Sequence, residues 1–166
     1  MISNITLIGF MGSGKTTVGK LLASILAYNF IDTDDLIESK EGISISEIFK
    51  TRGEEHFRQL ESSTLNHVIT LKNSVISTGG GIVTIDRNME ILKDANVIYL
   101  EATARQIYNN IKHDRSRPLL EGDDMYSKIN EILDTRRSLY EGAADHIIQV
   151  DGKTPEEIAS LILRRM

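Results

Sequence analysis

A glycine-rich segment near the start of the chain, GFMGSGKT at residues 9–16, constrains the fold more than any other feature. It fills every fixed position of the phosphate-loop pattern G-x-x-x-x-G-K-[ST]. The segment follows a short apolar run at residues 5–8 and opens helical spacing over residues 15–27. A strand that leads through such a loop into a helix is typical of α/β proteins that bind nucleotide phosphates. The alternative is a glycine-rich turn that binds nothing.

The residue types in this loop suit a phosphate ligand. Gly12 and Gly14 lack a Cβ atom, so the backbone can curl its N–H groups around an anion. Lys15 adds a mobile positive charge, and the helix that starts near it points its positive dipole end at the same place. The hydroxyl of Thr16 is placed to hold Mg²⁺. We therefore predict phosphate contacts from Gly12, Ser13, Gly14, Lys15, Thr16 and Thr17.

Strand-like and helical patterns alternate along the rest of the chain. We expect five strands, at residues 5–8, 28–31, 75–77, 96–100 and 147–150. Capping-box patterns at Ser44, Thr51 and Thr154 predict the starts of further helices. The alternation predicts an α/β fold with a mostly parallel sheet covered on both faces, which binds ligands at the carboxyl ends of its strands. A length of 166 residues without a linker favours one domain, residues 1–166.

Composition excludes several classes of function. The formal net charge of -5 disfavours binding to a nucleic-acid backbone, which needs a basic face. The absence of cysteine excludes a disulfide scaffold, a thiolate zinc site and a cysteine nucleophile. No apolar run approaches the roughly 18 residues that span a bilayer, and the first residues lack a signal-peptide pattern. We expect a cytoplasmic protein with neither a nucleic-acid nor a membrane partner.

Three acids follow the second predicted strand, at Asp32, Asp34 and Asp35. In an extended segment, Asp32 and Asp34 would face the same way and reach a common site. One could support magnesium while the other accepts a hydroxyl proton. The alternative is that this segment caps the next helix through Thr33 or Asp34.

Arg58 lies on a helix predicted to begin near Gly53, with Glu54 at i−4 and Glu61 at i+3. These residues make either a surface ion pair or an arginine that is held in place by acids. In the second case Arg58 would clamp an anionic substrate, because a guanidinium matches a carboxylate through two parallel hydrogen bonds.

Three further segments carry candidate binding groups. The glycines 79–81 follow the third strand and permit close approach of the backbone to a ligand, unless they only loosen a loop. Arg117 lies in a charged segment that is either a solvated loop or a lid over the phosphates. Arg136 and Arg137 come late in another helix, and their spacing does not say which one turns inward.

Taken in order, these motifs resemble the shikimate kinase family over almost the whole chain. The matching segments are the phosphate loop, DTD at 32–34, GEEHFR at 53–58, GGG at 79–81, RPLL at 117–120 and RRSLY at 136–140. The resemblance implies a small five-stranded parallel sheet similar to that of nucleoside monophosphate kinases. It also implies ATP-dependent phosphorylation of the 3-hydroxyl of shikimate, in aromatic amino-acid biosynthesis, by a monomer.

The resemblance further implies a role for each motif residue. Asp34 would bind and activate the substrate hydroxyl, with Lys15 and Arg117 as the other catalytic groups. Thr16 and Asp32 would form the magnesium side. Arg58 and Arg136 would clamp the substrate carboxylate, and the backbone of Gly79, Gly80 and Gly81 would contact the substrate. Arg117 would reach ATP from a lid at about 112–124, the substrate-binding helices would span about 34–61, and Pro155 would line the adenine site.

Two positions depart from the family pattern, and three other functions stay open. Ser138 stands where the family often has proline, and Asn110 where some relatives place an arginine against adenine. A kinase for another small hydroxy acid, such as gluconate, has the same requirements for a carboxylate clamp. A non-catalytic nucleotide switch would bind ATP without turnover, and a nucleic-acid kinase is disfavoured by the acidic charge.

Overall fold

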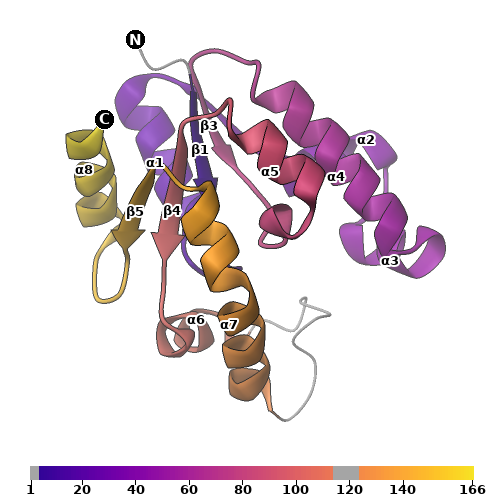
Figure 1. Cartoon of the computed structure of the whole chain (residues 1–166). Helices are drawn as coiled ribbons and strands as arrows, with labels where there is room; N and C mark the ends of the chain where they lie inside the picture. Colours follow the sequence, from indigo (N-terminus) through magenta and orange to yellow (C-terminus); the bar gives the residue numbers. More distant parts are fainter. Residues whose placement is uncertain (1–3, 114–123) are drawn as a thin grey trace.

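The computed structural model describes residues 4–113 and 124–166, and a five-stranded sheet lies at its centre (Figure 1). All neighbouring strands run parallel, in the order β2-β3-β1-β4-β5. Their bounds are β1 Asn4–Ile8, β2 Asn29–Asp32, β3 Ser74–Ser77, β4 Val97–Glu101 and β5 His146–Gln149. The predicted five-stranded parallel sheet is confirmed.

Helices cover both faces of this sheet. Helices α1 and α8 pack against each other behind the strands, whereas α7 crosses in front of β4 (Figure 1). The helices are α1 Lys15–Leu26, α2 Thr33–Glu41, α3 Ile45–Arg52, α4 Glu54–Val68, α5 Asp86–Leu92, α6 Ala104–Ile111, α7 Met125–Ala143 and α8 Pro155–Arg165, with the short 3-10 helix η1 at Ile82–Thr84. In the described part of the chain, no helix combines the length and the apolar character needed to cross a membrane.

The main core forms around the central strand β1, all of whose residues are buried. Such a strand has helices on both faces, which explains why Asn4 and Thr6 are buried together with the apolar residues of β1. A second, smaller cluster packs Ile37 of α2 against Ile48 of α3 and Phe57 of α4. This cluster fixes α2, α3 and α4 as a unit beside the β2 edge of the sheet (Figure 1).

Two of the three predicted capping boxes start helices. The Ser44 side chain accepts a hydrogen bond from the Glu47 N–H at the start of α3, and Thr154 and Glu157 form a complete capping box on α8. The prediction at Thr51 is wrong, because this residue lies in the last turn of α3 and its hydroxyl donates to the Glu47 carbonyl.

Gly53, rather than Thr51, lies at the start of the next helix. Its N–H bonds to the Phe49 carbonyl at the end of α3, and it is also the N-cap residue of α4. The φ angle of 86° at Gly53 lies in the region that side chains disfavour. A glycine rather than a hydroxyl cap therefore begins the helix that carries Arg58.

Candidate active site

The carboxyl ends of β1, β2 and β3 open onto a cavity of about 520 Å³. The phosphate loop, the acids after β2 and the glycines after β3 contribute to its wall, together with Pro155 at the first position of α8. This is the edge at which ligands of parallel α/β sheets bind. The structure thus brings the separate sequence motifs to one place.

The phosphate loop holds its shape through backbone contacts and a buried lysine. Lys15 is only 7% exposed, and its ammonium group donates to the carbonyl oxygens of Gly9 at 2.7 Å and Phe10 at 3.0 Å. Gly12 has a φ angle of 77°, and a Cβ atom there would lie 2.5 Å from Cγ2 of Ile111 on α6. Both the conformation and the close helix therefore require glycine at position 12.

Asp32 combines the two roles that its segment left open. One carboxylate oxygen accepts from the N–H groups of Asp34 at 2.9 Å and Asp35 at 3.2 Å, which makes Asp32 the N-cap of α2. The expectation of a cap at Thr33 or Asp34 is therefore wrong, because the helix already begins at Thr33. The other oxygen accepts from the Thr16 hydroxyl at 3.2 Å, so it faces the phosphate loop.

The oxygen atoms of Thr16 and Asp32 suit a magnesium ion. Within residues 4–113 and 124–166, no cluster of three or more His, Asp or Glu side chains could hold a metal by itself. In phosphoryl-transfer sites, however, Mg²⁺ uses only one or two protein oxygens and takes its other ligands from phosphates and water. A hydroxyl beside a carboxylate at the phosphate loop fits that chemistry.

Asp34 reaches the glycine run from the first turn of α2 rather than from an extended segment, so the alternation argument for its direction is wrong. A Cβ atom on Gly79 would lie 3.0 Å from Oδ1 of Asp34 and 3.0 Å from Oε2 of Glu61. Burial, followed by the charges of Asp32 and Glu61, raises the pKa of Asp34 to about 7, while Lys15 opposes the shift. A carboxyl group with this pKa can exchange a proton near neutral pH.

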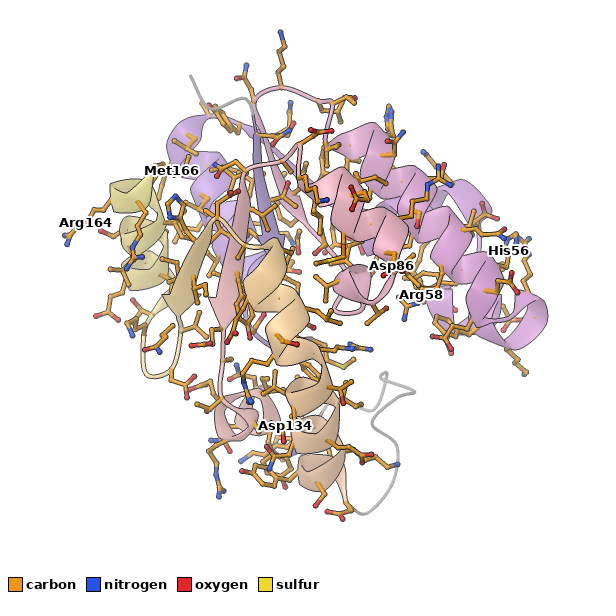
Figure 2. The ribbon with its side chains drawn as sticks, viewed as in Figure 1. His56, Arg58, Asp86, Asp134, Arg164 and Met166 are labelled. Carbon is orange, nitrogen blue, oxygen red and sulfur yellow. The ribbon has the colours of Figure 1, made fainter. Side chains whose placement is uncertain are left out.

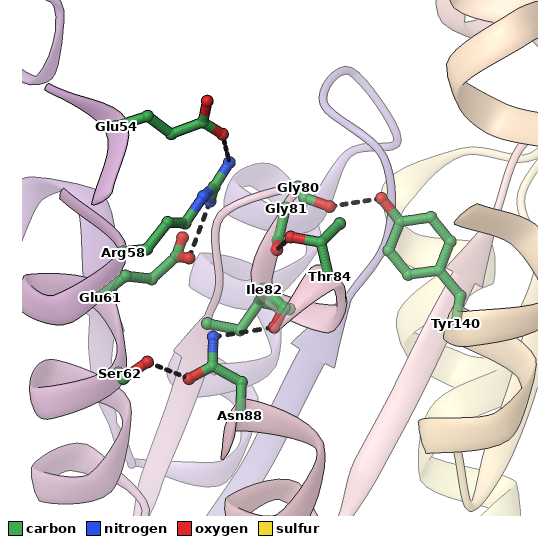
Figure 3. Close-up of polar contacts among 10 residues, drawn as sticks. All are labelled: Glu54, Arg58, Glu61, Ser62, Gly80, Gly81, Ile82, Thr84, Asn88 and Tyr140. Carbon is green, nitrogen blue, oxygen red and sulfur yellow. Dashed lines mark hydrogen bonds and ion pairs between the residues drawn. The ribbon is translucent and has the colours of Figure 1, made fainter. Parts of the chain in front are cut away.

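Arg58 is held beside the glycine run by an ion pair with Glu61 (Figure 3). The distance from Nη1 to Oε1 is 2.8 Å, and the two side chains are 13% and 1% exposed. Burial raises the pKa of Glu61, and the Arg58 guanidinium opposes that shift. Glu54 lies farther away, at 3.5 Å from Nη2. This burial excludes the interpretation of Arg58 and Glu61 as a surface pair.

The Arg58 side chain lies on the side of α4 that faces the sheet (Figure 2). A Cβ atom on Gly81 would lie 2.7 Å from both Nη1 and Nη2 of Arg58. The guanidinium therefore rests directly on the glycine backbone, in a position that any side chain at residue 81 would occupy. The glycine run allows this close approach.

The structure distinguishes Arg136 from Arg137 on α7. Arg136 is partly buried, its guanidinium carbon lies 5.9 Å from the Phe10 ring centre, and its charge acts on Glu61. Arg137 is exposed and pairs with Asp134 at 2.9 Å. Arg136 is therefore the arginine that turns inward, toward Phe10 and Glu61, so that its charge and that of Arg58 act on the same carboxylate.

Two residues of the site region were missed by the sequence-based site prediction. Glu61 was considered only as a partner of Arg58, although its i+3 spacing was the available signal. Tyr140 lies in the RRSLY segment, but nothing in the spacing showed that its hydroxyl donates to the Gly80 carbonyl. Arg117 and residues 114–123 of the lid predicted at about 112–124 lie outside the described residues.

Asn110 forms a hydrogen bond with the phosphate loop. Its side-chain nitrogen donates to the Gly12 carbonyl at 2.7 Å, and its oxygen accepts from Gln106 at 3.0 Å. Both residues line the cavity. The asparagine at position 110 thus connects α6 with the phosphate loop.

Comparisons with known proteins agree with this geometry. The sequence model of the family described as Shikimate kinase matches residues 11–166. A shikimate kinase of Alkaliphilus oremlandii is 51% identical over 161 residues, which cover 95% of each chain. The structure of a shikimate kinase from Acinetobacter baumannii in complex with shikimate has a TM-score of 0.95 at 37% identity, covering 99% of this chain and 93% of that one. A gluconokinase from Sinorhizobium meliloti matches 98% of this chain and 90% of its own with a TM-score of 0.61 at 16% identity, which shows a shared fold alone.

Proposed function

Since the chain belongs to the shikimate kinase family, we propose that it transfers the γ-phosphoryl group of ATP to the 3-hydroxyl of shikimate. The products are shikimate 3-phosphate and ADP, and the reaction belongs to aromatic amino-acid biosynthesis. The observation that carries this proposal is the joining of a phosphate loop, a carboxyl group with a pKa of about 7 and two inward arginines at one sheet edge. The shikimate bound to the Acinetobacter baumannii relative supports the choice of substrate.

At the phosphate end, the backbone of residues 12–17 surrounds the phosphates of ATP. Lys15 supplies the positive charge, and its carbonyl contacts already hold it in the loop. Pro155 lines the cavity and would border the adenine. In this proposal Arg117 adds a further charge from the lid during transfer.

Thr16 and Asp32 would hold Mg²⁺ at the edge of the loop. When bound, the ion neutralises charge on the phosphate oxygens. The N-cap bonds of Asp32 keep its carboxylate in one orientation, so that its second oxygen stays directed at Thr16.

At the acid end, Arg58 and Arg136 bind the carboxylate of shikimate together with the backbone of Gly79–Gly81. This fixes the 3-hydroxyl near Asp34. The hydroxyl oxygen forms a bond to the γ-phosphorus while the bond from that phosphorus to the bridging oxygen breaks, and ADP leaves with the electron pair. The hydroxyl proton passes to the Asp34 carboxylate, whose raised pKa makes it a suitable acceptor.

A coupled ADP assay tests this function most directly. Purified protein is supplied with ATP, Mg²⁺ and, in parallel, shikimate, quinate or gluconate. We expect ADP release above background with shikimate, with both the other acids well below it, and loss of the signal on chelation of magnesium. Tight ATP binding without turnover of any acid would instead indicate a non-catalytic nucleotide protein.

We also propose that the enzyme acts as one domain and as a monomer in the cytoplasm. The phosphate loop, Asp34 and the glycine run of one chain line a single cavity, which supports a site formed within one copy. Light scattering at assay concentration checks the monomer, and fractionation of cells checks the location.

A further inference from the structure

Tyr140 is a fully buried residue of α7 to which the reaction above assigns no role. Its hydroxyl donates a hydrogen bond to the Gly80 carbonyl (Figure 3). Arg136, one helical turn earlier, lies close enough for its charge and its N–H groups to act on the same hydroxyl and to lower the pKa of Tyr140 against the effect of burial. The hydroxyl therefore lies between an arginine of α7 and the glycine run.

The ring of Tyr140 is held in a fixed position. It stacks on Tyr99 of β4, with ring centres 5.0 Å apart and planes inclined by 22°. Burial raises the pKa of Tyr140 to about 12, so the phenol keeps its proton and remains a donor at neutral pH. A buried hydroxyl with a donor and an acceptor partner has little freedom to turn elsewhere.

The contact to Gly80 also orients the next peptide group. A trans peptide is planar, so its N–H points opposite to its carbonyl. By holding the Gly80 carbonyl, Tyr140 thus sets the direction of the Gly81 N–H. The Arg58 guanidinium lies against the same Gly81.

Other side chains donate hydrogen bonds to the carbonyls of the two residues after Gly80 (Figure 3). The Thr84 hydroxyl donates to the Gly81 carbonyl at 2.7 Å, and Asn88 donates to the Ile82 carbonyl at 2.9 Å. Ser62 in turn donates to Asn88 at 2.6 Å. Tyr140 differs from these supports because it alone among them also contacts an inward arginine.

We propose that Tyr140 is a positioning residue that aligns Arg136 and the Gly80–Gly81 peptide as one surface for the carboxylate of the acid substrate. It acts through those two groups. The inference rests on the proposed function for the identity of the acid. Its structural content, a coupling of Arg136 to Gly81 through one hydroxyl, is independent of turnover.

The kinetic test compares Tyr140→Phe with Tyr99→Phe. The first change removes the bridging hydroxyl and keeps the ring. The second removes the hydroxyl of the stacked partner, which makes no hydrogen bond with the described residues, and serves as the matched control. For Tyr140→Phe we expect the KM for shikimate to rise about tenfold, the size of one lost hydrogen bond, with kcat and the KM for ATP within about twofold. Tyr99→Phe should leave all three unchanged.

The carboxamide analogue of shikimate separates positioning from general loosening. It lacks the charge that Arg136 would bind, so Tyr140→Phe should raise its KM by less than about twofold. An equal rise for acid and amide, or a parallel rise in the KM for ATP, would overturn the proposal.

A second measurement does not depend on the stability of Tyr140→Phe or on activity. In the free protein, Arg136→Ala should shift the amide resonance of Gly81, whereas Arg137→Ala should not. An unmoved Gly81 resonance in Arg136→Ala overturns the coupling. Wild-type protein that fails to phosphorylate shikimate would instead contradict the proposed function, and the resonance would still decide the coupling.

Discussion

The two ends of the proposed site are built in different ways. The phosphate end comes mainly from one continuous segment, residues 9–17, and depends on the geometry of its backbone. The acid end is assembled from α2, α4, the loop after β3 and α7, and it depends on side chains. A phosphate can be bound by neighbouring N–H groups, whereas a hydroxy acid needs different groups at separate positions.

The electrostatics of the two ends differ as well. At the phosphate end the single buried ammonium of Lys15 is surrounded by carbonyl oxygens. At the acid end, Asp34 and Glu61 meet at Gly79 with Arg58 and Arg136 nearby, and burial raises the pKa of both carboxyl groups. Sensitivity to pH and to single charge changes should therefore concentrate at the acid end.

The largest expected effect is that of Asp34→Asn. Loss of the proton acceptor should lower kcat by about 10²- to 10⁴-fold, the usual contribution of a general base. The KM for ATP should stay within about twofold, because the phosphate loop is unchanged. Asp35→Asn, an exposed neighbour on the same turn, is the matched control. Wild-type kcat in Asp34→Asn would show that the acid end supplies no proton acceptor.

Arg58→Ala should weaken binding of shikimate by about 1.5–3 kcal/mol, because a charged hydrogen-bonding partner is removed. Arg136→Ala carries the same expectation. Arg137→Ala is the control on the same helix, since its side chain points to solvent and pairs with Asp134. Titration calorimetry with shikimate measures all three, and equal affinities in Arg58→Ala and Arg137→Ala would remove the proposed clamp.

Gly81→Ala should have a smaller effect at the acid end. The new Cβ would lie 2.7 Å from the Arg58 guanidinium, which is the flexible end of a long side chain and can move aside. We expect the KM for shikimate to rise severalfold with little change in the KM for ATP. Gly142→Ala on α7, where nothing lies within 4 Å of the added atom, is the control. A rise in the KM for ATP alone would reverse the assignment of the two ends.

The smallest expected effect is a pH dependence of stability in the free protein. The folded-state pKa of Asp34, about 7, lies well above the ordinary value of an aspartate carboxyl, so the folded state holds this proton more tightly. The resulting stabilisation is complete below about pH 4 and is lost as the pH rises through 7. The Tm of the wild type should therefore fall from pH 5 to pH 8 more steeply than that of Asp34→Asn. Parallel Tm curves would contradict the raised pKa.

The same difference explains how much could be predicted from the sequence. The phosphate loop and the parallel sheet follow from local patterns, so they were predicted with nearly correct bounds. The inward turn of Arg136 could not be predicted, because both arginines lie on one helix and only the packing of α7 distinguishes them. The direction of Asp34 was inferred from strand alternation. In the structure it results from the start of α2 at Thr33, capped by Asp32, so that Asp34 lies in the first turn of a helix.

The missed residues depend on contacts between distant segments. Tyr140 and Gly80 are 60 positions apart, and no spacing rule connects a hydroxyl on one helix with a carbonyl in a loop. The prediction at Thr51 was wrong for a different reason. Its local pattern matches a capping box, but α3 extends through this residue to Arg52. A capping pattern in the sequence does not show whether the preceding helix has already ended, so it can also occur inside a helix.

The buried pair of Arg58 and Glu61 restricts how the substrate preference of such an enzyme can evolve. Loss of Arg58 leaves the buried Glu61 beside the charge of Arg136, and loss of Glu61 leaves Arg58 with the more distant Glu54. Either change breaks a buried pair, which typically costs about 3–5 kcal/mol, a large part of the stability of a small domain. A descendant that accepts an uncharged polyol would have to exchange both residues in a single step or pass through a poorly folded ancestor. The preference for an acid is thus protected by folding stability as well as by selection for activity.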